Sequence, residues 1–253
     1  MTLAITRDIS PRFNECEITH IDRTPINLDV ARAQHHGYVQ ALKNLGCAVL
    51  ELPAEPDLPD SVFVEDTAII LPEVALLTRP GADSRKPEVD SILWALTPYR
   101  KLVRITAPGT VDGGDVLVLG KKIFVGLSTR SDQAAVDQMN RLLGPYGYQV
   151  TGVELHDCLH LKSAVTRVDD STLLINRRWV DVEHFEGFHL IDIDPSEPFA
   201  ANCLPVNGAI IYPTSFPKTR KKLEDKGYTV KAVSVDELAK AEGAVTCCSL
   251  VIE

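Results

Sequence analysis

Residues 111–127 read VDGGDVLVLGKKIFVGL, which places two short apolar runs on either side of Gly120-Lys121. Runs of this length around a turn predict a β-hairpin. An amphipathic segment, Ser131–Leu143, follows and stops at Gly144, the kind of residue that commonly ends a helix. Gln149–Leu155 then predicts another strand. The stretch therefore specifies a unit of strand, turn, strand, helix and strand.

The order of elements in this unit recurs along the chain. An earlier copy is predicted from two strands, a helix and a strand at Phe63–Leu71, Val74–Arg79, Asp83–Leu96 and Lys101–Thr106. A later copy is predicted at Cys203–Val206, Ala209–Tyr212, Pro217–Asp225 and Thr229–Val235, with Asn207-Gly208 as a strong hairpin signal. The copy between them, which begins near Leu159, fits less well because Arg178–Phe188 has little helical periodicity.

A fifth copy is divided between the two ends of the chain. It combines the strand Cys247–Ile252 with the strand Leu3–Thr6, the helix Val30–Leu45 and the strand Ala48–Leu52. The copies start at regular intervals, since the markers Glu65, Asp112, His160, Asn202 and Cys247 are separated by 47, 48, 42 and 45 residues. Repeats of this length indicate stacked or circular architectures. Because the termini complete one copy, we expect the α/β units to close a ring and to bring the markers together near its axis.

The composition is that of an ordinary globular protein. The 253 residues are 45% hydrophobic and contain no linker-like or low-complexity run, so we expect one domain over residues 1–253. Neither a membrane span nor a signal peptide is recognisable, and we therefore expect a cytoplasmic protein whose six cysteines are thiols. The net charge of −9 disfavours nucleic acid and anionic membranes as partners and suits a small cationic substrate.

Three of the markers carry the groups of a cysteine-centred covalent catalyst: the thiol of Cys247, the imidazole of His160 and the carboxylate of Asp112. Each residue alone has an ordinary structural explanation, but their equivalent positions in three units favour a shared site. In a strand, Cys247 and Cys248 would face opposite sides, so only one of them can face that site. The neighbouring Gly113-Gly114 predicts the close approach of a ligand or of another backbone.

Two further groups of residues give weaker signals. His156, Cys158 and His160 are metal-ligand types at alternate positions, which on a strand would share one face. No second cluster with metal spacing exists in the sequence, so we expect no metal site.

Arg85 and Arg130 open the helical segments of two units. They are either solubilising surface residues or a pair that clamps a carboxylate.

Six motifs resemble those of the dimethylarginine dimethylaminohydrolase family of guanidine-modifying enzymes: FVED (63–66), TRPGADSR (78–85), VDGGD (111–115), LHLK (159–162), AANC (200–203) and TCCS (246–249). The resemblance implies the pentein fold, which is a five-bladed α/β propeller of ββαβ repeats with pseudo-fivefold symmetry. It also implies the hydrolysis of Nω-methylated arginines to citrulline and methylamine or dimethylamine, with no metal or other cofactor.

The resemblance assigns roles to individual residues. Cys247 is expected to be the nucleophile, His160 the proton donor and acceptor, and Asp112 the third catalytic residue. The substrate guanidinium is expected to lie near four carboxylates: Asp60, Glu65, Asp66 and Asp112. The remaining expected contacts are Arg85 and Arg130 with the α-carboxylate, the backbone of Ala241 with the α-amino group, and Ile18 in a lid at about Glu17–Ile21.

Two other functions remain open on these residues. An arginine deiminase or an amidinotransferase of the same superfamily would share the cysteine, the histidine and the acid, although such enzymes usually carry an added helical domain or long insertions. A non-enzymatic thiol sensor would use the vicinal Cys247-Cys248 pair, but it would need neither Asp112 nor His160. The expected partner is thus a small methylated arginine, and a homodimer is left open.

Overall fold

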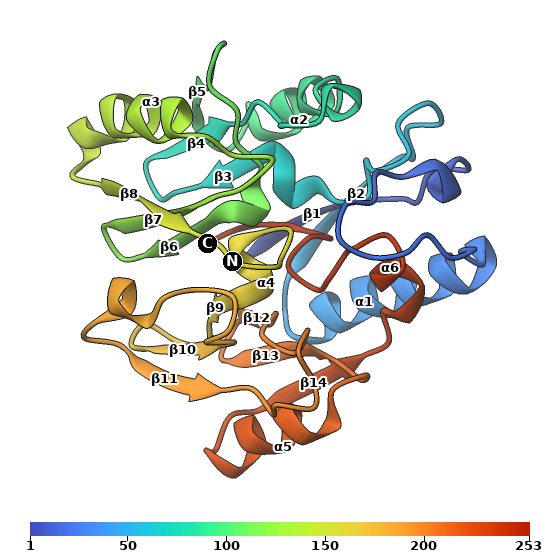
Figure 1. The fold of residues 1–253 in the computed structure, drawn as a ribbon. Helices are drawn as coiled ribbons and strands as arrows, with labels where there is room; N and C mark the ends of the chain where they lie inside the picture. Colours follow the sequence, from blue (N-terminus) through green and yellow to red (C-terminus); the bar gives the residue numbers. More distant parts are fainter.

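Fifteen strands form five separate three-stranded sheets in the computed structural model, which describes residues 1–253 (Figure 1). The sheets are β15-β1-β2, β3-β4-β5, β6-β7-β8, β9-β10-β11 and β12-β13-β14. In each one, the middle strand pairs antiparallel with the first strand and parallel with the third. The bounds are β1 Leu3–Arg7, β2 Ala48–Leu52, β3 Ala68–Ile70, β4 Val74–Leu77, β5 Lys101–Arg104, β6 Val116–Leu119, β7 Lys122–Leu127, β8 Gln149–Glu154, β9 Val165–Arg167, β10 Thr172–Ile175, β11 His189–Asp192, β12 Leu204–Val206, β13 Ala209–Pro213, β14 Val230–Val233 and β15 Leu250–Ile252.

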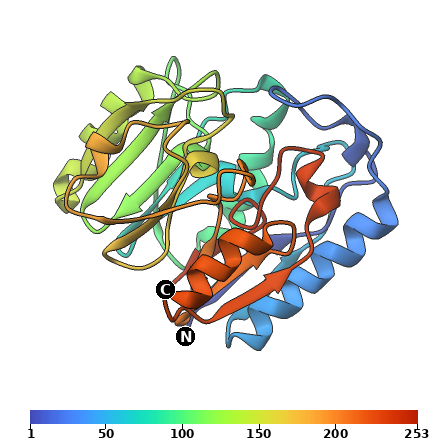
Figure 2. The same ribbon diagram turned by 60° about the horizontal axis from the view of Figure 1, so that its bottom comes forward.

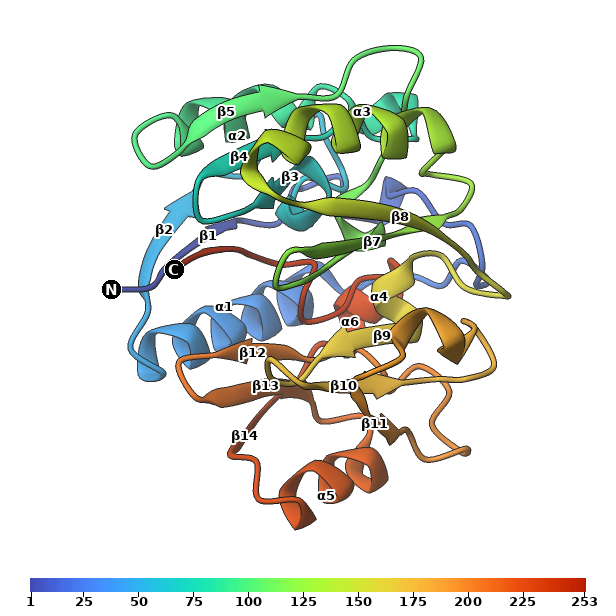
Figure 3. The same cartoon turned by 90° about the vertical axis from the view of Figure 1, so that its left-hand side faces the viewer.

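Helices connect four of the five parallel strand pairs, since parallel strands need a long crossover connection, which is usually a helix. They are α1 Leu28–Asn44, α2 Glu88–Leu96, α3 Gln133–Leu143 and α5 Pro217–Asp225, and they lie outside the sheets (Figures 1 and 3). Local signals start several of them: the Asn27 and Asp132 side chains cap α1 and α3, and Pro217 opens α5. The third unit has only a 3₁₀ turn, η6 (Val182–Phe185), which confirms the weak helical pattern there. Neither α4 (Leu161–Ala164) nor α6 (Asp236–Ala239) exceeds one turn.

The split fifth unit is confirmed. Strand β1 pairs antiparallel with β15, with Leu3 opposite Ile252, and parallel with β2. The two termini accordingly lie close together, as Figures 2 and 3 both show. The predicted hairpin is also confirmed, because Asn207 and Gly208 both have positive φ between β12 and β13. No helix is both long and apolar enough to span a bilayer.

The predicted strand starts are wrong by several residues. Phe63–Leu71 and Cys247–Ile252 were expected to be strands throughout, but the strands begin only at Ala68 and Leu250. Short helical turns precede them in several units, including η2 (Val64–Thr67) and η4 (Gly113–Asp115). The reason is that backbone groups before these strands bond to other units rather than to a strand ladder: the Glu65 N–H donates to the Cys247 carbonyl and the Thr246 N–H to Asn202 Oδ1.

These bonds link each unit to the next. Asp66 Oδ1 accepts from Gly114 N–H at 2.8 Å, and Asp115 Oδ1 accepts from Leu161 N–H at 2.9 Å. Asn202 makes the next two links, through Nδ2 to the Lys162 carbonyl and through Oδ1 to Thr246 N–H, each at 3.1 Å. The Glu65 N–H donates to the Cys247 carbonyl at 3.1 Å and joins the last unit to the first. The five marker positions are therefore connected in sequence.

The hydrophobic core is divided into five clusters, each shared by two neighbouring sheets. Adjacent residues of a middle strand enter different clusters because successive side chains point to opposite faces. In β7, for example, Ile123 packs with residues of the β3-β4-β5 sheet and Phe124 with those of the β9-β10-β11 sheet. Five small sheets packed in this manner are consistent with a propeller-like arrangement.

Candidate active site

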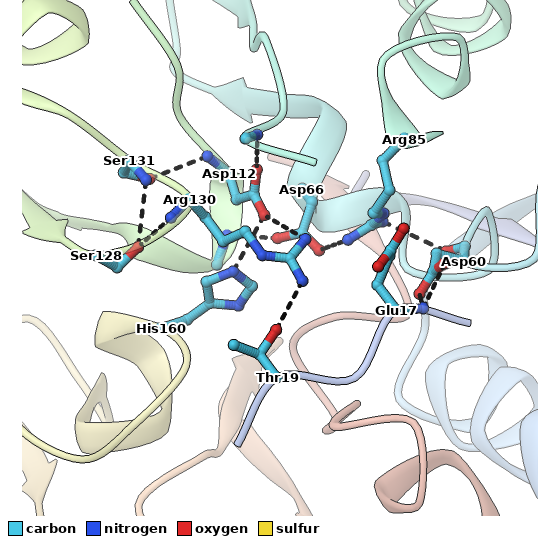
Figure 4. Close-up of polar contacts among 12 residues, drawn as sticks. Glu17, Thr19, Asp60, Asp66, Arg85, Asp112, Ser128, Arg130, Ser131 and His160 are labelled. Atoms are coloured by element: carbon cyan, nitrogen blue, oxygen red, sulfur yellow. Dashed lines mark hydrogen bonds and ion pairs between the residues drawn. The ribbon is translucent and has the colours of Figure 1, made fainter. Parts of the chain in front are cut away.

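Asp66, Asp112 and His160 converge from three different units (Figure 4). One polar atom from each lies within 4.8 Å of the others, and all three side chains are buried. His160 Nε2 is 3.2 Å from Asp112 Oδ2, while Asp112 Oδ1 accepts from the Gly81 N–H at 2.9 Å. The structure therefore brings together two of the three predicted catalytic residues and one predicted carboxylate of the substrate site.

The Gly113-Gly114 pair is required by the packing of this cluster. A Cβ on Gly114 would lie 2.5 Å from His160 Nδ1 and 3.0 Å from Asp66 Oδ1, and one on Gly113 would overlap the Glu65 carbonyl. Real Cβ atoms do not approach other atoms so closely. The predicted close approach is confirmed, and the groups that approach are a backbone and the side chains of the site.

Carboxylates determine the charge of His160. Burial alone would lower its pKa, but Asp115, Asp66 and Asp112 outweigh this effect and raise it to about 9. Burial would raise the pKa of Asp66. The charges of Arg85 and His160, together with the hydrogen bonds that the carboxylate accepts, outweigh burial and lower this pKa to about 2. At neutral pH the site thus holds the imidazolium of His160 beside the ionised carboxylate of Asp66.

This charge state predicts how stability depends on pH. Because the folded pKa of His160 is raised to about 9, its contribution is fully present below its ordinary pKa of about 6.5 and is lost as the pH rises through about 9. The contribution is of the order of 3 kcal/mol. Urea unfolding of the wild type and of His160→Ala should be measured at pH 6 and at pH 9.5. We expect the difference in their free energies of unfolding to be smaller at pH 9.5. A difference in the free energy of unfolding that does not change with pH would contradict the raised pKa of His160.

Cys247 lies in a turn before β15 and is partly exposed. Its Sγ accepts a hydrogen bond from the Ala244 N–H at 3.3 Å and makes none to His160. Burial raises the pKa of the thiol well above its usual value, and the nearby Glu65 and Asp66 charges add to this effect. Without a cation beside it, Cys247 is therefore a neutral thiol at neutral pH.

The strand argument that separated Cys247 from Cys248 is wrong, because residues 245–248 form a turn and do not alternate between two faces. The two thiols are nevertheless in different environments. Cys248 is fully buried in the hydrophobic core against α1, and its Sγ lies 3.5 Å from the Ala244 carbonyl. Burial raises its pKa as well. The charge of Glu65 acts on both thiols, whereas that of Asp66 is among the causes only for Cys247.

Two residues for which no role was predicted hold the Glu65 carboxylate. Lys162 Nζ donates to Oε1 at 2.6 Å, and Thr246 Oγ1 donates to Oε2 at 2.8 Å. Both lie in motifs quoted above, but Lys162 is 97 residues from Glu65 and no local pattern predicts the pair. Glu65 and Lys162 also line a cavity of about 740 Å³ that does not include Cys247 or His160. They therefore form the boundary between the cluster and this cavity.

Arg85 is an internal ion-pair partner rather than a free cation. Its guanidinium donates to Asp66 Oδ2 at 2.6 Å, to Glu88 Oε2 at 2.8 Å and to the Phe63 carbonyl at 3.2 Å, and its side chain is 5% exposed. Burial raises the pKa of Glu88 to about 7 despite this pairing. Arg85 thus fixes the Asp66 carboxylate, a role that the sequence did not predict.

Arg130 has fewer partners. Its Nη2 donates to Thr19 Oγ1 at 3.0 Å, and its Nη1 is 4.0 Å from Asp112 Oδ2 (Figure 4). Its backbone is fixed by Gly81, where a Cβ would overlap the Arg130 carbonyl. Arg130 therefore lies between the catalytic cluster and the segment that contains Thr19, with donors available to a ligand.

The other predicted contacts lie around the segment 17–21, which we call the lid. Asp60 accepts from the Glu17 N–H at 3.1 Å, so its carboxylate is bonded to the lid and not to the cluster of Asp66, Asp112 and His160. Burial raises its pKa. Ile18 is half-buried and packs on the core near α1, and Ala241 is buried in the turn after α6. No hydrogen bond within the protein reaches the Ala241 carbonyl.

The two arginines should respond differently to substitution. Arg85→Ala leaves two buried carboxylates without their partner, so we expect it to lower the free energy of unfolding by about 3–5 kcal/mol. Arg130→Ala should leave the fold nearly unchanged and weaken the binding of a carboxylate by about 1.5–3 kcal/mol. Urea unfolding and KM measurements on both variants test this. Similar stability losses in the two would contradict the distinction.

The alternation of metal-ligand types at His156–His160 does not form a shared face. The segment bends instead of continuing as a strand; His156 is exposed near Asp181, and Cys158 is buried in the core. The only cluster of ligand types that the structure assembles is Asp66, Asp112 and His160. With Arg85 and Arg130 beside it, this cluster is already partly neutralised by arginines.

Comparison with known proteins agrees with the sequence motifs. Residues 14–252 match the family described as N,N dimethylarginine dimethylhydrolase, eukaryotic. A dimethylarginine dimethylaminohydrolase from Streptomyces coelicolor is 38% identical over 249 residues, which cover 98% of this chain and 95% of that protein. The chain therefore has relatives of this family along nearly its whole length.

Solved structures give the same result. A Pseudomonas aeruginosa enzyme, a cysteine-to-serine mutant complexed with citrulline, superimposes with a TM-score of 0.95 at 33% identity and covers 99% of this chain and 98% of its own. A histidine-to-glycine dimethylarginine dimethylaminohydrolase, as an adduct with S-methyl-L-thiocitrulline, also has a TM-score of 0.95 and 33% identity, and covers 99% of both chains. The chain belongs to the dimethylarginine dimethylaminohydrolase family.

Proposed function

We propose that this protein hydrolyses Nω-methylated arginines to citrulline and methylamine or dimethylamine, with Cys247 as the nucleophile. The observation that carries the proposal is the convergence of His160 with the buried carboxylates of Asp66 and Asp112, with His160 Nε2 3.2 Å from Asp112 Oδ2. The Asp66 charge that helps to raise the pKa of the Cys247 thiol would be offset by a bound cation. The relatives named above support it, since one binds citrulline and another forms an adduct with a thiocitrulline.

The first step uses the charge of the substrate. A guanidinium beside Glu65 and Asp66 offsets the two charges that raise the pKa of Cys247, so binding favours the thiolate. The hydrogen bond from the Ala244 N–H also favours the charged sulfur. The thiolate adds to the central guanidinium carbon, and the bond from that carbon to the methylated nitrogen breaks. His160 gives its proton to the departing amine and leaves a thiouronium on Cys247.

The second step consumes water. His160, now neutral, takes a proton from a water molecule that attacks the thiouronium carbon. The carbon–sulfur bond then breaks, the hydroxyl proton of the tetrahedral intermediate passes to the sulfur, and citrulline and the neutral Cys247 thiol are released. Asp112 orients the imidazole through the 3.2 Å contact to Nε2 and favours its charged form. Asp115 contributes to the same charge from a position bonded to Ser128 and Ser131.

The remaining substrate groups have candidate partners at the edge of the cluster. Arg130 has donors for the α-carboxylate, and the unpaired Ala241 carbonyl is an acceptor for the α-amino group. Ile18 would cover the aliphatic chain from the lid. Arg85 holds the Asp66 carboxylate in place, and Asp60 binds the lid through the Glu17 N–H. For both residues we propose this indirect role in place of a direct contact with the substrate.

For the architecture we propose that the five sheets are the blades of a single α/β propeller with pseudo-fivefold symmetry, spanning residues 1–253. The sequential bonds among the five markers support this, as do the five core clusters that each join two neighbouring sheets. A proposal of one domain follows because no cluster belongs to one sheet alone.

Substrate specificity tests the proposal. A methylated nitrogen has fewer N–H donors than the same nitrogen of arginine. Carboxylates placed to bind every donor of arginine would therefore lose a partner when methylated arginine binds. A site that prefers methylated arginine must bind the unmethylated nitrogen atoms of the guanidinium. We expect monomethylarginine and asymmetric dimethylarginine to be turned over with higher kcat/KM than arginine, as measured by citrulline release. Equal or better use of arginine would favour an arginine deiminase, and inactivity on all three would leave the thiol sensor.

A further inference from the structure

A carboxylate outside the catalytic cluster holds the lid. The backbone N–H groups of Thr19 and His20 donate to Oε2 and Oε1 of Glu242, each at 2.7 Å. One carboxylate thus receives two consecutive amides from a segment more than 200 residues away in the sequence. Hydrogen bonds to an ionised acceptor are stronger than neutral ones. Residues Thr19 and His20 are themselves exposed, and apart from the hydrogen bond between Thr19 Oγ1 and Arg130 the two amides hold this part of the segment.

The backbone of Glu242 is unusual. Its φ is 58°, in the left-handed region that residues other than glycine, asparagine and aspartate seldom adopt. The turn around it is fixed by hydrogen bonds from Glu242 N–H to the Ala239 carbonyl and from Gly243 N–H to the Leu238 carbonyl. A Cβ on Gly243 would overlap the Phe63 ring, so the turn is packed tightly as well. A rare conformation retained by such packing is a pointer to function.

Residues next to Glu242 in the same turn lie at the proposed binding site of the substrate α-amino group and at the nucleophile. Ala241, with its unpaired carbonyl, precedes Glu242, and the Ala244 N–H donates to Cys247 Sγ at 3.3 Å. On its other side the lid is bonded to Arg130 through Thr19 Oγ1 at 3.0 Å. The lid therefore bridges the turn that carries Glu242 and the arginine that has donors for a carboxylate.

We propose that Glu242 is a positioning residue that latches the lid over the bound substrate. The role rests on the proposed function as far as the substrate is concerned, but the latch itself is a property of the free protein. Glu242 touches no reacting atom. It keeps Ile18 and Thr19 against the site, so its loss raises KM and leaves the chemical step unchanged.

The latch is tested by amide hydrogen exchange on the ligand-free protein. Glu242→Gln keeps the size of the side chain but can accept from only one of the two amides and has no charge. Glu242→Gly removes the acceptor and at the same time relieves the positive φ, so this variant should fold at least as stably as the wild type. In both variants we expect exchange at Thr19 and His20 to be faster by about 10-fold.

Glu237→Gln is the matched control. Glu237 is also a carboxylate of the α6 region that accepts a backbone N–H, from Asn27 at 2.8 Å, but it makes no bond to the lid. Its substitution should leave exchange at Thr19 and His20 unchanged. Unchanged exchange at these amides in both Glu242 variants would overturn the latch.

Kinetics test the consequence for the substrate. KM for asymmetric dimethylarginine should rise by about 5- to 10-fold in both Glu242 variants, with kcat within about twofold of the wild type. Faster exchange with an unchanged KM, or a loss confined to kcat, would overturn the positioning role. A wild-type protein that turns over no methylated arginine would refute the proposed function, whereas the exchange measurement would still decide whether the latch exists.

Discussion

Cys247→Ser should abolish citrulline formation, with kcat lowered by at least about 1000-fold and the fold and substrate binding retained. A hydroxyl in this turn cannot ionise as a thiol does, even with a guanidinium beside Glu65 and Asp66. The measurement is citrulline release from asymmetric dimethylarginine, combined with urea unfolding. Because the side chain is only partly buried, the loss of activity should come without a large loss of stability.

Cys248→Ser is the matched control for this prediction. Cys248 is buried in the core near α1, and a serine there can donate to the Ala244 carbonyl that Sγ now approaches. We expect kcat within about threefold of the wild type and a stability loss of about 1–3 kcal/mol from burying the hydroxyl. An inactive Cys248→Ser with an active Cys247→Ser would show that the wrong thiol has been identified as the nucleophile.

His160→Ala should lower kcat by about 10²- to 10⁴-fold, since both amine departure and water attack need a proton carrier at this position. The residue is also buried beside Asp112, so some stability is lost, and the activity must be measured where the variant is folded. Steady-state kinetics at pH 7 and 15 °C, with circular dichroism on the same samples, separates the two effects.

His35→Ala provides the comparison for burial alone. His35 is a buried histidine of α1, and burial lowers its pKa to about 4, so it is neutral at physiological pH. Its replacement should cost stability while kcat stays close to that of the wild type. A His160→Ala variant that resembles His35→Ala, unstable but catalytically normal, would mean that His160 has a packing role only.

Local signals in the sequence predicted much of the fold. The Asn207-Gly208 turn and the helix that begins at Pro217 both occur where expected, because their determinants are contained in the residues themselves. The strands at Ala68 and Leu250 start late because the residues before them bond to other units: the Glu65 N–H donates to the Cys247 carbonyl, and the Thr246 N–H donates to Asn202 Oδ1. Those bonds join residues 182 and 44 positions apart, and no local pattern in the sequence reveals them.

In the candidate site, too, local motifs predicted some residues, while contacts between distant segments could not be predicted. The motifs around Asp112 and His160 predicted residues that the structure does bring together. The pairing of Arg85 with Glu88 could have been suspected from their spacing of three residues, since such neighbours meet on one side of a helix or turn. The contact of Lys162 with Glu65 and that of Glu242 with the lid depend entirely on how segments distant in the sequence pack together.

The central claim is that a methylated amine leaves before water attacks a carbon bonded to Cys247. Acid-quenched reactions with monomethylarginine and with asymmetric dimethylarginine, followed by peptide mass spectrometry, measure this most directly. We predict one adduct on the peptide containing Cys247, of the same mass from both substrates because the methylated nitrogen has already departed. Adducts that differ by the mass of the extra methyl group, an adduct on Cys248, or citrulline formed at full rate with no adduct on Cys247 would contradict the account.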